Sequence, residues 1–393
     1  VLLTERMVQP MDKPTVQDIF HRFYPAYLDQ YSPSPVQAKV AHNIMNCKTG
    51  AYGANVCVCE DCGFVQIHYN SCRNRCCPMC QAVPKEMWMD ARREDILDAP
   101  YFHLVFTVPD ILNPVIYSNQ RLLYDALYHA ASSTISELTA DPKHLGAKVG
   151  YICILHTWGS EMNFHPHIHT ILLGGGLASN NQWKDNGENF FLPIRVISKV
   201  FRGKYLEELK RLWEEDKLVF HGTAEKFRNH YTFKELLDSC YGMDWIPHCK
   251  KTFNGAQTVM KYLGKYTHRI AVSNHRTVRM DDDTVTFLVK DYRNEGQWKE
   301  LTISGVEFVR RFLMHVPPRR FVRIRHYGLL CSRTKSQKLT LCRNLLGCKK
   351  YLSKLRDMEM PEILEHLYGI KVCVCKACGG HLGKPQMRMP LRC

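Results

Sequence analysis

Hydrophobic positions along the chain follow two kinds of spacing, and their order predicts the fold class. Recurrence at every third or fourth position, typical of amphipathic helices, covers residues 14–45, 83–97 and 120–138. Short apolar runs that end at proline or glycine, typical of strands, cover residues 103–108, 149–158 and 167–173. A strand, a helix and two strands joined by short loops favour an α+β fold, in which a central antiparallel sheet has flanking helices.

Later segments extend this layout and suggest three parts. Residues 178–250 contain a charged amphipathic helix near 204–216 and are interpreted as a helical insertion. Two apolar runs at 284–289 and 298–303 predict a hairpin. We expect an N-terminal helical and zinc-binding module for DNA recognition (1–95), a catalytic domain (96–285) and a basic C-terminal DNA-binding region (286–393).

The charge of the chain is strongly positive and unevenly distributed. The formal net charge is +15, and residues 308–356 contain 14 Lys or Arg but no Asp or Glu. An unbroken basic segment favours contact with the phosphates of nucleic acid. A membrane surface is the weaker interpretation, because Pro317 and Pro318 interrupt the segment. No run of about eighteen apolar residues occurs, so we expect no membrane span.

The 18 cysteines indicate metal ligation rather than disulfides, because the first residues lack the pattern of a secretory signal. Two Cys-x2-Cys pairs are separated by fourteen residues: Cys59/Cys62 and Cys77/Cys80. Each pair can point two thiolates at one ion, so together they predict one tetrahedral structural zinc site.

Further cysteines leave alternatives open. A second zinc site in the N-terminal module has four candidate ligands: Cys47, His68, Cys72 and Cys76. The alternative is that Cys57 and Cys76 are small buried residues. The C-terminal cysteines form either another small zinc site or a loosely ordered tail with reduced thiols: Cys373, Cys375, Cys378 and Cys393. Arg73 and Arg75, between the two pairs, are expected to contact phosphates.

A histidine pair is the most specific candidate for chemistry. His167 and His169 flank Ile168 in a strand-like run. Side chains alternate along a strand, so both imidazoles should point to one face while Ile168 points into the core. Two imidazoles on a rigid strand supply two ligands of a divalent metal site, although a lone His-x-His is common by chance.

A tyrosine pair further along the chain adds to this pattern. If residues 254–266 are helical, Tyr262 and Tyr266 lie one turn apart on one face. The alternative is an ordinary amphipathic helix with two half-buried rings. Lys265 could lower a phenol pKa, contact a phosphate or be solvated. Combined with the histidine pair and the basic segment, the tyrosines suggest covalent cutting of DNA.

Together these residues resemble the two-tyrosine rolling-circle transposases of bacterial insertion sequences, of the insertion-sequence-91 type, within the HUH superfamily of single-strand nucleases. The resemblance covers most of the chain and rests on six blocks: 70–80, 100–107, 156–159, 165–169, 262–269 and 323–330. One departure is Cys76, where relatives carry histidine; a thiolate can replace an imidazole on zinc.

The resemblance implies an HUH-like fold with the histidine pair on the middle strand and the tyrosines on a facing helix. It implies a catalytic Mg²⁺ or Mn²⁺ bound by His167, His169 and a third ligand. Glu161 is the first choice for that ligand, ahead of Gln257 and His165. A tyrosine would form a 5′-phosphotyrosine, and the second tyrosine would serve a second strand. No ATP is needed, and the P-loop glycines that would bind it are absent from the sequence.

The implied partner is single-stranded and hairpin DNA at the element ends, in the cytoplasm and nucleoid of a bacterium. Oligomeric state stays open. Expected DNA contacts in the basic segment are Arg319, Arg320, Arg323 and Arg325. One rival is a transposase with a carboxylate triad, but its only aspartate cluster, 281–283, is interpreted as a hairpin turn. The other rival is a non-catalytic zinc-finger DNA-binding protein derived from a transposase.

Overall fold

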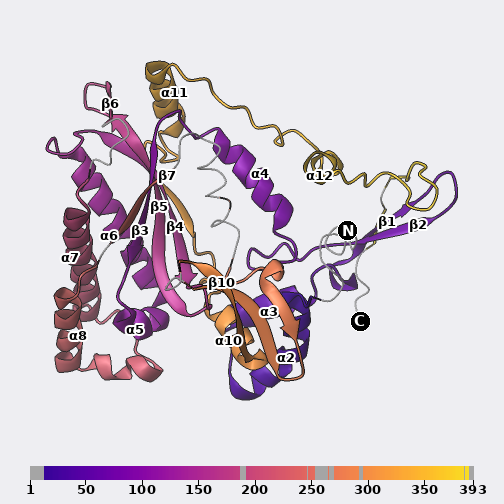
Figure 1. Ribbon diagram of the computed structural model, residues 1–393, viewed down its shortest axis with the longest axis horizontal. Helices are drawn as coiled ribbons and strands as arrows, with labels where there is room; N and C mark the ends of the chain where they lie inside the picture. The colour runs from indigo at the N-terminus through magenta and orange to yellow at the C-terminus, as the bar shows by residue number, and fades with distance from the viewer. Residues whose placement is uncertain are drawn as a thin grey trace.

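The computed structural model describes residues 13–185, 192–245, 247–252, 264, 270–291, 295–384 and 386–388. Figure 1 shows a central sheet beside long helices, a smaller body built around α2, α3 and α10, and a hairpin of β1 and β2 that projects away from both. Among the described residues, no helix combines the length and the apolar character that crossing a bilayer requires.

The central sheet contains six strands in the described part of the chain, and every pairing is antiparallel. The order is β11-β4-β5-β3-β7, with β6 paired to β5. This order confirms the predicted antiparallel sheet and gives the histidine pair the middle strand, β5. The strands are β3 (Tyr101–Thr107), β4 (Lys148–Trp158), β5 (Phe164–Leu177), β6 (Trp183–Asp185), β7 (His248–Thr252) and β11 (Ile324–Gly328).

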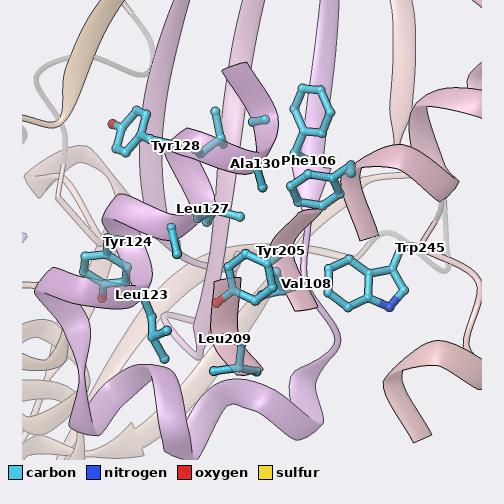
Figure 2. Close-up of a cluster of buried hydrophobic side chains, with 14 of the residues drawn as sticks. Phe106, Val108, Leu123, Tyr124, Leu127, Tyr128, Ala130, Tyr205, Leu209 and Trp245 are labelled. Carbon is cyan, nitrogen blue, oxygen red and sulfur yellow. The ribbon is translucent and has the colours of Figure 1, made fainter. Parts of the chain in front are cut away.

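One face of this sheet packs against long helices and forms the largest core (Figures 1 and 2). Ile168 of β5 is fully buried in it, as its place in the strand predicts, together with Phe106 of β3. Leu127 and Tyr205 come from the two helices that pack on each other, α6 and α7. The helices α7 and α8 of the segment 178–250 therefore cover the sheet, whereas its strands β6 and β7 belong to the sheet. The helices are α5 (Asn113–Ser118), α6 (Gln120–Ala140), α7 (Ile194–Glu214) and α8 (His230–Gly242).

The opposite face of the sheet packs against α4 (Ala82–Arg93) and α11 (Lys335–Leu346). Ile154 of β4 and Ile171 of β5 are buried there. Because side chains alternate along a strand, His169 projects from the same face as Ile171. The predicted metal ligands therefore lie on the α4 side of the sheet, away from the largest core.

A second core joins the N-terminal helices to residues beyond 270. Phe20 of α2 packs edge-on against Phe312 of α10, with ring centroids 5.2 Å apart. The three-part division stays a prediction from sequence, and its expected boundary at residue 285 runs through this core, of which Val285 is a member. The elements are α2 (Val16–Gln30), α3 (Pro35–Met45), α10 (Gly305–Met314) and the antiparallel sheet of β8 (Thr277–Met280), β9 (Thr284–Asp291) and β10 (Gln297–Ser304).

The predicted helix over 14–45 is two helices. Ser34 caps the second one, since its hydroxyl accepts a hydrogen bond from the Gln37 amide, and Pro35 occupies its first turn. Both features start a new helix rather than continue the old one. The predicted hairpin at 284–303 is confirmed as β9 and β10. The remaining elements are β1 (Ala54–Val58), β2 (Val65–Tyr69), α12 (Met360–Tyr368) and β12 (Gln386–Arg388).

His315, directly after α10, connects the second core to the central sheet. Its Nε2 lies 3.0 Å from the Met162 carbonyl oxygen, and its Nδ1 lies 3.1 Å from the Thr157 hydroxyl. Nε2 therefore donates to the carbonyl, and Nδ1 accepts from the hydroxyl. Burial lowers the pKa of His315 to about 4, although its hydrogen bond to the Met162 carbonyl acts in the opposite direction. The imidazole is a neutral part of the interface at physiological pH.

We expect His315 to make folding sensitive to acid. An unfolded histidine titrates near pH 6.5, so between about pH 6.5 and pH 4 the unfolded chain binds a proton that the folded chain does not. Stability should fall as the pH falls through this window. When the pH is lowered from 7.5 to 5, the unfolding free energy of the parent should fall by about 2 kcal/mol more than that of His315→Gln. Urea unfolding at both pH values measures this, and exposed His221→Gln is the control. An equal loss in His315→Gln and the parent would contradict the prediction.

Candidate metal centres and nucleic-acid groove

Three imidazoles converge at one end of the β4–β5 hairpin. The register of these strands places His156 directly opposite His167, and His169 follows two residues later on the same face. The candidate ligand nitrogens of the three residues lie within 4.8 Å of one another, and all three residues are buried. Such a cluster offers three nitrogen donors to one divalent cation and leaves the remaining positions around it for other ligands.

Burial keeps the imidazoles of His167 and His169 uncharged. It lowers the pKa of His167 to about 4 and that of His169 well below its ordinary value. His167 Nδ1 lies 2.7 Å from the His165 carbonyl oxygen, so Nδ1 donates and Nε2 keeps its lone pair. His167 Nε2 and His169 Nε2 are 3.0 Å apart. A neutral ring with a free lone pair is the form that binds a metal.

His103 supports this cluster from the neighbouring strand β3. Its Nε2 lies 2.9 Å from His169 Nδ1, and the two rings stack with centroids 5.1 Å apart. If His169 binds a cation through Nε2, its Nδ1 carries the proton and donates to His103. A partner on the second ring nitrogen fixes the tautomer and the orientation of a metal ligand.

Glu161, the expected third ligand, lies outside the histidine cluster. It is exposed in the tight turn between β4 and β5, where the Gly159 amide donates to the Asn163 carbonyl. The third member of the cluster is His156. His165, another candidate, has its Nδ1 3.1 Å from Asp110 Oδ1 and is outside the cluster.

The predicted catalytic tyrosines, Tyr262 and Tyr266, lie outside the described residues, as do Gln257 and Lys265. Gly264, between the tyrosines, is described as helical and buried. A Cβ added to it would lie 2.1 Å from Met89 Sδ of α4. Gly264 therefore lies directly against the Met89 side chain of α4, the helix that covers the sheet face with the histidines.

The cysteines form two groups of four thiols, and neither is the group predicted from spacing. One contains Cys47, Cys72, Cys77 and Cys80, and the other contains Cys59, Cys62, Cys375 and Cys378. The two Cys-x2-Cys pairs thus belong to different groups. The physical reason is that Cys59 and Cys62 lie at the far end of the projecting β1–β2 hairpin, whereas Cys77 and Cys80 lie beside the end of α3.

The first group is buried against α3. Cys72 Sγ and Cys80 Sγ are 3.8 Å apart, and the Asn74 amide donates to Cys72 Sγ at 3.4 Å. Hydrogen bonds from neighbouring thiols, Cys47 first, raise the pKa of Cys77 and lower that of Cys80. Four thiols this close cannot all ionise without a cation, and Zn²⁺ is the cation that four thiolates suit.

The remaining candidates for zinc ligation lie outside both groups. Cys76 is buried, and its burial raises the thiol pKa to about 11. His68 lies on β2, where its Nε2 is 2.7 Å from Gln66 Nε2. Cys57 is buried in a small cluster with Leu382. The alternative of small buried residues therefore describes Cys57 and Cys76. Of the C-terminal cysteines, Cys373 lies outside both groups and Cys393 lies outside the described residues.

A basic groove of about 410 Å³ lies beside the first thiol group. Its walls are α3, the loop between Cys72 and Cys77, and the segment after α10. Arg75 joins two of these walls, because its guanidinium donates to the carbonyls of Phe321 at 2.5 Å and Pro318 at 3.3 Å. The charged residues lining the groove are all basic and exposed: Lys39, Arg73, Arg75, Arg319 and Arg320.

Two other arginines expected to contact DNA pack within the protein. Arg325 pairs with Asp125 and stacks on the Tyr128 ring at 4.0 Å. Arg323 lies over the Trp158 ring at 5.8 Å, and burial lowers its pKa. Part of the basic segment therefore stabilises the fold, which charge counting could not reveal.

Sequence reasoning did not identify His156 as a member of the histidine cluster or His103 as its neighbour. It also did not bring the Cys59/Cys62 pair together with the Cys375/Cys378 pair. A signal for His156 was present. With the turn at 159–163, antiparallel pairing brings residue 156 opposite residue 167. His103 lies one strand further, and its position required the order of the sheet. The thiol partnership between residues far apart in sequence had no local signal.

Comparison with known proteins identifies the class. The family described as "Putative transposase" matches residues 150–338, and the "Transposase zinc-binding domain" matches residues 19–108. "Putative transposase y4qJ" from Sinorhizobium fredii is 40% identical over 369 residues, which cover 93% of each chain. The transposase for insertion sequence element IS801 from Pseudomonas savastanoi pv. phaseolicola is 30% identical over 309 residues, covering 77% of this chain and 72% of that protein.

The chain is a transposase with a zinc-binding domain, and its function lies in DNA transposition. It belongs to the insertion-sequence-91 type, as its motifs predicted. Solved structures of the conjugative relaxase TrwC in complex with oriT DNA are also similar. The metal-bound form shares 15% identity at a TM-score of 0.25, over 47% of this chain and 67% of that one. The metal-free form shares 12% sequence identity at a TM-score of 0.24, over 44% of this chain and 74% of that one. TM-scores this low support no inference about function.

We expect His103 to act as a positioning residue for the cluster. His103→Phe keeps a ring against His169 but removes the hydrogen-bond partner, so affinity for Mn²⁺ should fall by about 10- to 100-fold. Isothermal titration with Mn²⁺ measures this, and His103→Gln should recover part of the affinity because an amide oxygen can accept from Nδ1. Equal affinity in His103→Phe and the parent would show that the contact is packing alone.

Proposed function

We propose that this transposase cuts and rejoins single-stranded DNA at element ends through a 5′-phosphotyrosine intermediate, in rolling-circle transposition. The observation that carries the proposal is the cluster of His156, His167 and His169: three buried imidazoles with their candidate ligand nitrogens within 4.8 Å of one another. Their chemistry fits a cation that acts on a phosphate.

The three imidazole nitrogens favour Mn²⁺ over Mg²⁺. With Glu161 outside the cluster, the described ligands are all nitrogen, whereas Mg²⁺ prefers oxygen. Mn²⁺ binds imidazole more readily, and other first-row divalent ions bind it more tightly still. Bound there, the cation would supply charge neutralisation at a phosphate oxygen. We therefore propose Mn²⁺ rather than Mg²⁺ as the better activator.

The tyrosines are the proposed nucleophiles. The Oη of Tyr262 or Tyr266 would attack phosphorus in line, forming an O–P bond while the bond from phosphorus to the 3′-oxygen breaks. The phenol loses its proton, the departing 3′-oxygen gains one, and the 5′ end stays on the tyrosine. The reverse attack by a 3′-hydroxyl rejoins DNA without ATP, because the phosphodiester energy is retained. A second tyrosine can hold a second strand.

The position of Gly264 supports this assignment. It lies against Met89 and Lys85 of α4, and Met89 packs on the cluster that includes Ile154 and Ile171. These isoleucines share the sheet face with His156 and His169. The residue between the two tyrosines is thus on the side of the sheet where the imidazoles point.

We further propose that the basic groove carries the DNA backbone toward the histidines, with zinc in the first thiol group holding its wall. The loop that displays Arg73 and Arg75 is bounded by the two thiol residues Cys72 and Cys77. From the groove the chain runs to Arg323, which covers Trp158, and the Trp158 ring stacks on His156 at 4.4 Å. Basic and aromatic side chains in succession suit a single strand.

The two alternative functions, a carboxylate-triad transposase and a non-catalytic DNA-binding protein, receive less support. In the aspartate cluster, Asp281 accepts hydrogen bonds from the amides of Asp283 and Thr284 within the β8–β9 turn. Asp282 pairs with Arg22 of α2. These contacts serve a turn, not a two-metal site. A non-catalytic binder has no need for three buried imidazoles at one point.

The decisive test is a covalent adduct with DNA. Labelled single-stranded oligonucleotides from both flanks of the encoding gene, incubated with Mn²⁺, should give a labelled protein band on a denaturing gel. His156→Ala and His167→Ala should reduce the adduct by about 100-fold or more, the size of effect seen when a group stabilising the charged transition state is lost. Glu161→Gln should leave it unchanged. An adduct lost in Glu161→Gln but kept in His156→Ala would reverse the assignment.

The same assay tests the tyrosines. Phe keeps the ring and removes only the hydroxyl. Tyr262→Phe and Tyr266→Phe separately should leave an adduct in at least one variant, and the double variant should give none. Tyr231→Phe, at an exposed position, is the control. An adduct in the double variant would exclude both phenols as nucleophiles.

The groove predicts a salt dependence. Each phosphate contact to a single strand contributes about 0.7 to the slope of log affinity against log salt. Arg73→Gln combined with Arg319→Gln should weaken binding and make that slope shallower by about 1.4. Fluorescence anisotropy over a salt series measures it. Arg195→Gln with Lys199→Gln removes two exposed charges from α7, away from the groove, and should leave the slope unchanged. Equal slopes in both double variants would contradict a backbone site in the groove.

A further inference from the structure

The second thiol group lies where the β1–β2 hairpin meets the C-terminal segment. Cys59 and Cys62 belong to the turn between β1 and β2, and Cys375 and Cys378 follow α12. Cys59 Sγ is 3.5 Å from Cys378 Sγ, and Cys62 Sγ is 3.8 Å from Cys375 Sγ. The zinc-binding domain that matches residues 19–108 contains only the first two of these four thiols.

These distances fit a bound ion and not disulfides. A tetrahedron of sulfurs at about 2.3 Å from Zn²⁺ has edges of about 3.8 Å. A disulfide holds its sulfurs at about 2.05 Å. The four sulfurs lie within 4.8 Å of one another. Four sulfur donors in this arrangement select zinc over hard cations such as Mg²⁺.

The two Cys-x2-Cys turns of this group have the same backbone hydrogen bonds. In each Cys-x2-Cys-Gly turn, the glycine amide donates to the carbonyl of the first cysteine: Gly63 to Cys59 at 3.0 Å, and Gly379 to Cys375 at 2.9 Å. Both glycines have positive φ, 69° and 76°. The first cysteine's amide also donates to the residue five positions later, Phe64 or Gly380, at 2.9 and 2.8 Å.

Amide donors are aimed at the sulfurs of the C-terminal half. The Ala377 amide lies 3.4 Å from Cys375 Sγ, and the Gly380 amide lies 3.4 Å from Cys378 Sγ. Hydrogen bonds from amides to sulfur stabilise the thiolate, which is the form that ligates zinc. The C-terminal turn is therefore built like the N-terminal one, as one half of a zinc site.

Backbone pairing holds the two halves together. β12 adds to β1 as an antiparallel neighbour, and Cys59 forms a bridge with Leu382. The Glu60 amide donates to the His381 carbonyl at 3.1 Å, and the Gly383 amide donates to the Val58 carbonyl at 2.9 Å. The only described apolar cluster here is small: Cys57, Cys59, Cys375 and Leu382. So small a core needs a metal to hold it.

We propose that Cys59, Cys62, Cys375 and Cys378 bind a second Zn²⁺ that clasps the C-terminal segment onto the β1–β2 hairpin. Before it reaches this clasp, the segment is tied to α4, where Asp90 accepts from the Tyr351 hydroxyl at 2.6 Å and from the Leu355 amide at 2.9 Å. In Figure 1 the yellow segment then runs past α12 to the hairpin. The clasp thus links the hairpin, through the C-terminal segment, to the α4 layer over the histidines.

Thiol protection on the unmodified full-length chain tests the proposal. Cys62, Cys373 and Cys378 are all exposed, but only Cys373 lies outside the group. With zinc present, iodoacetamide should modify Cys373 at least about tenfold faster than Cys62 and Cys378, because thiolates bound to metal are shielded. A chelator should remove that difference. Peptide mapping by mass spectrometry reads each site. Equal rates at the three cysteines before chelation would overturn the proposal.

Metal content gives the second measurement. Cys375→Ser with Cys378→Ser should hold one zinc ion fewer per chain than the parent, by elemental analysis after gel filtration. Cys373→Ser, in the same segment, should hold as many as the parent. If the double variant keeps the full zinc content, Cys59 and Cys62 find their partners elsewhere and the clasp does not exist. Neither measurement depends on DNA cleavage, so the clasp and the proposed function can fail separately.

Discussion

The antiparallel register of β4 and β5 is the constraint on which the functional site depends. It sets His156 opposite His167 and leaves Ile168 in the largest core, so shifting the pairing by one residue would turn the imidazoles into that core. The fully buried Ile168 makes such a shift costly. The core on one face of the sheet therefore fixes the positions of the imidazoles on the other face. His103 is held against His169 by the register of β3 with β5.

The described residues contain two kinds of candidate metal ligand, imidazoles and thiols. Three imidazoles on rigid strands form one cluster, which offers a cation fewer than four protein ligands, whereas the thiols form two groups of four. Closed tetrahedral groups suit a structural role, and open clusters suit a catalytic one. The first thiol group holds a loop of exposed arginines beside the basic groove, so a structural ion there would fix the shape of a DNA-binding wall.

Local patterns predicted much of the fold, and the failures concern contacts between distant residues. Strand alternation correctly gave the direction of Ile168, and the motifs identified the family. Spacing did not predict which cysteines lie together, because Cys-x2-Cys pairs look alike whatever their partners. Cys375, whose Sγ lies next to that of Cys62, is 313 residues away. Charge counting could not show that Arg323 and Arg325 stack on aromatic rings, because it cannot separate a solvated arginine from a stacked one. The position of His156 beside the histidine pair depends on the strand register, whereas Glu161 was chosen only for its nearness to the strand end.

The pairing of β1 with β12 has a consequence for synthesis of the chain. A ribosome makes β1 long before β12, and the 313 residues between Cys62 and Cys375 take roughly 15 to 60 s at bacterial rates of about 5 to 20 residues per second. Throughout that time the nascent hairpin has an unpaired strand edge and two thiols without their later partners. A product that stops before residue 375 keeps both. Pairing of β12 with β1 therefore requires a chain that reaches residue 388, and shorter chains carry an exposed edge that favours aggregation or proteolysis.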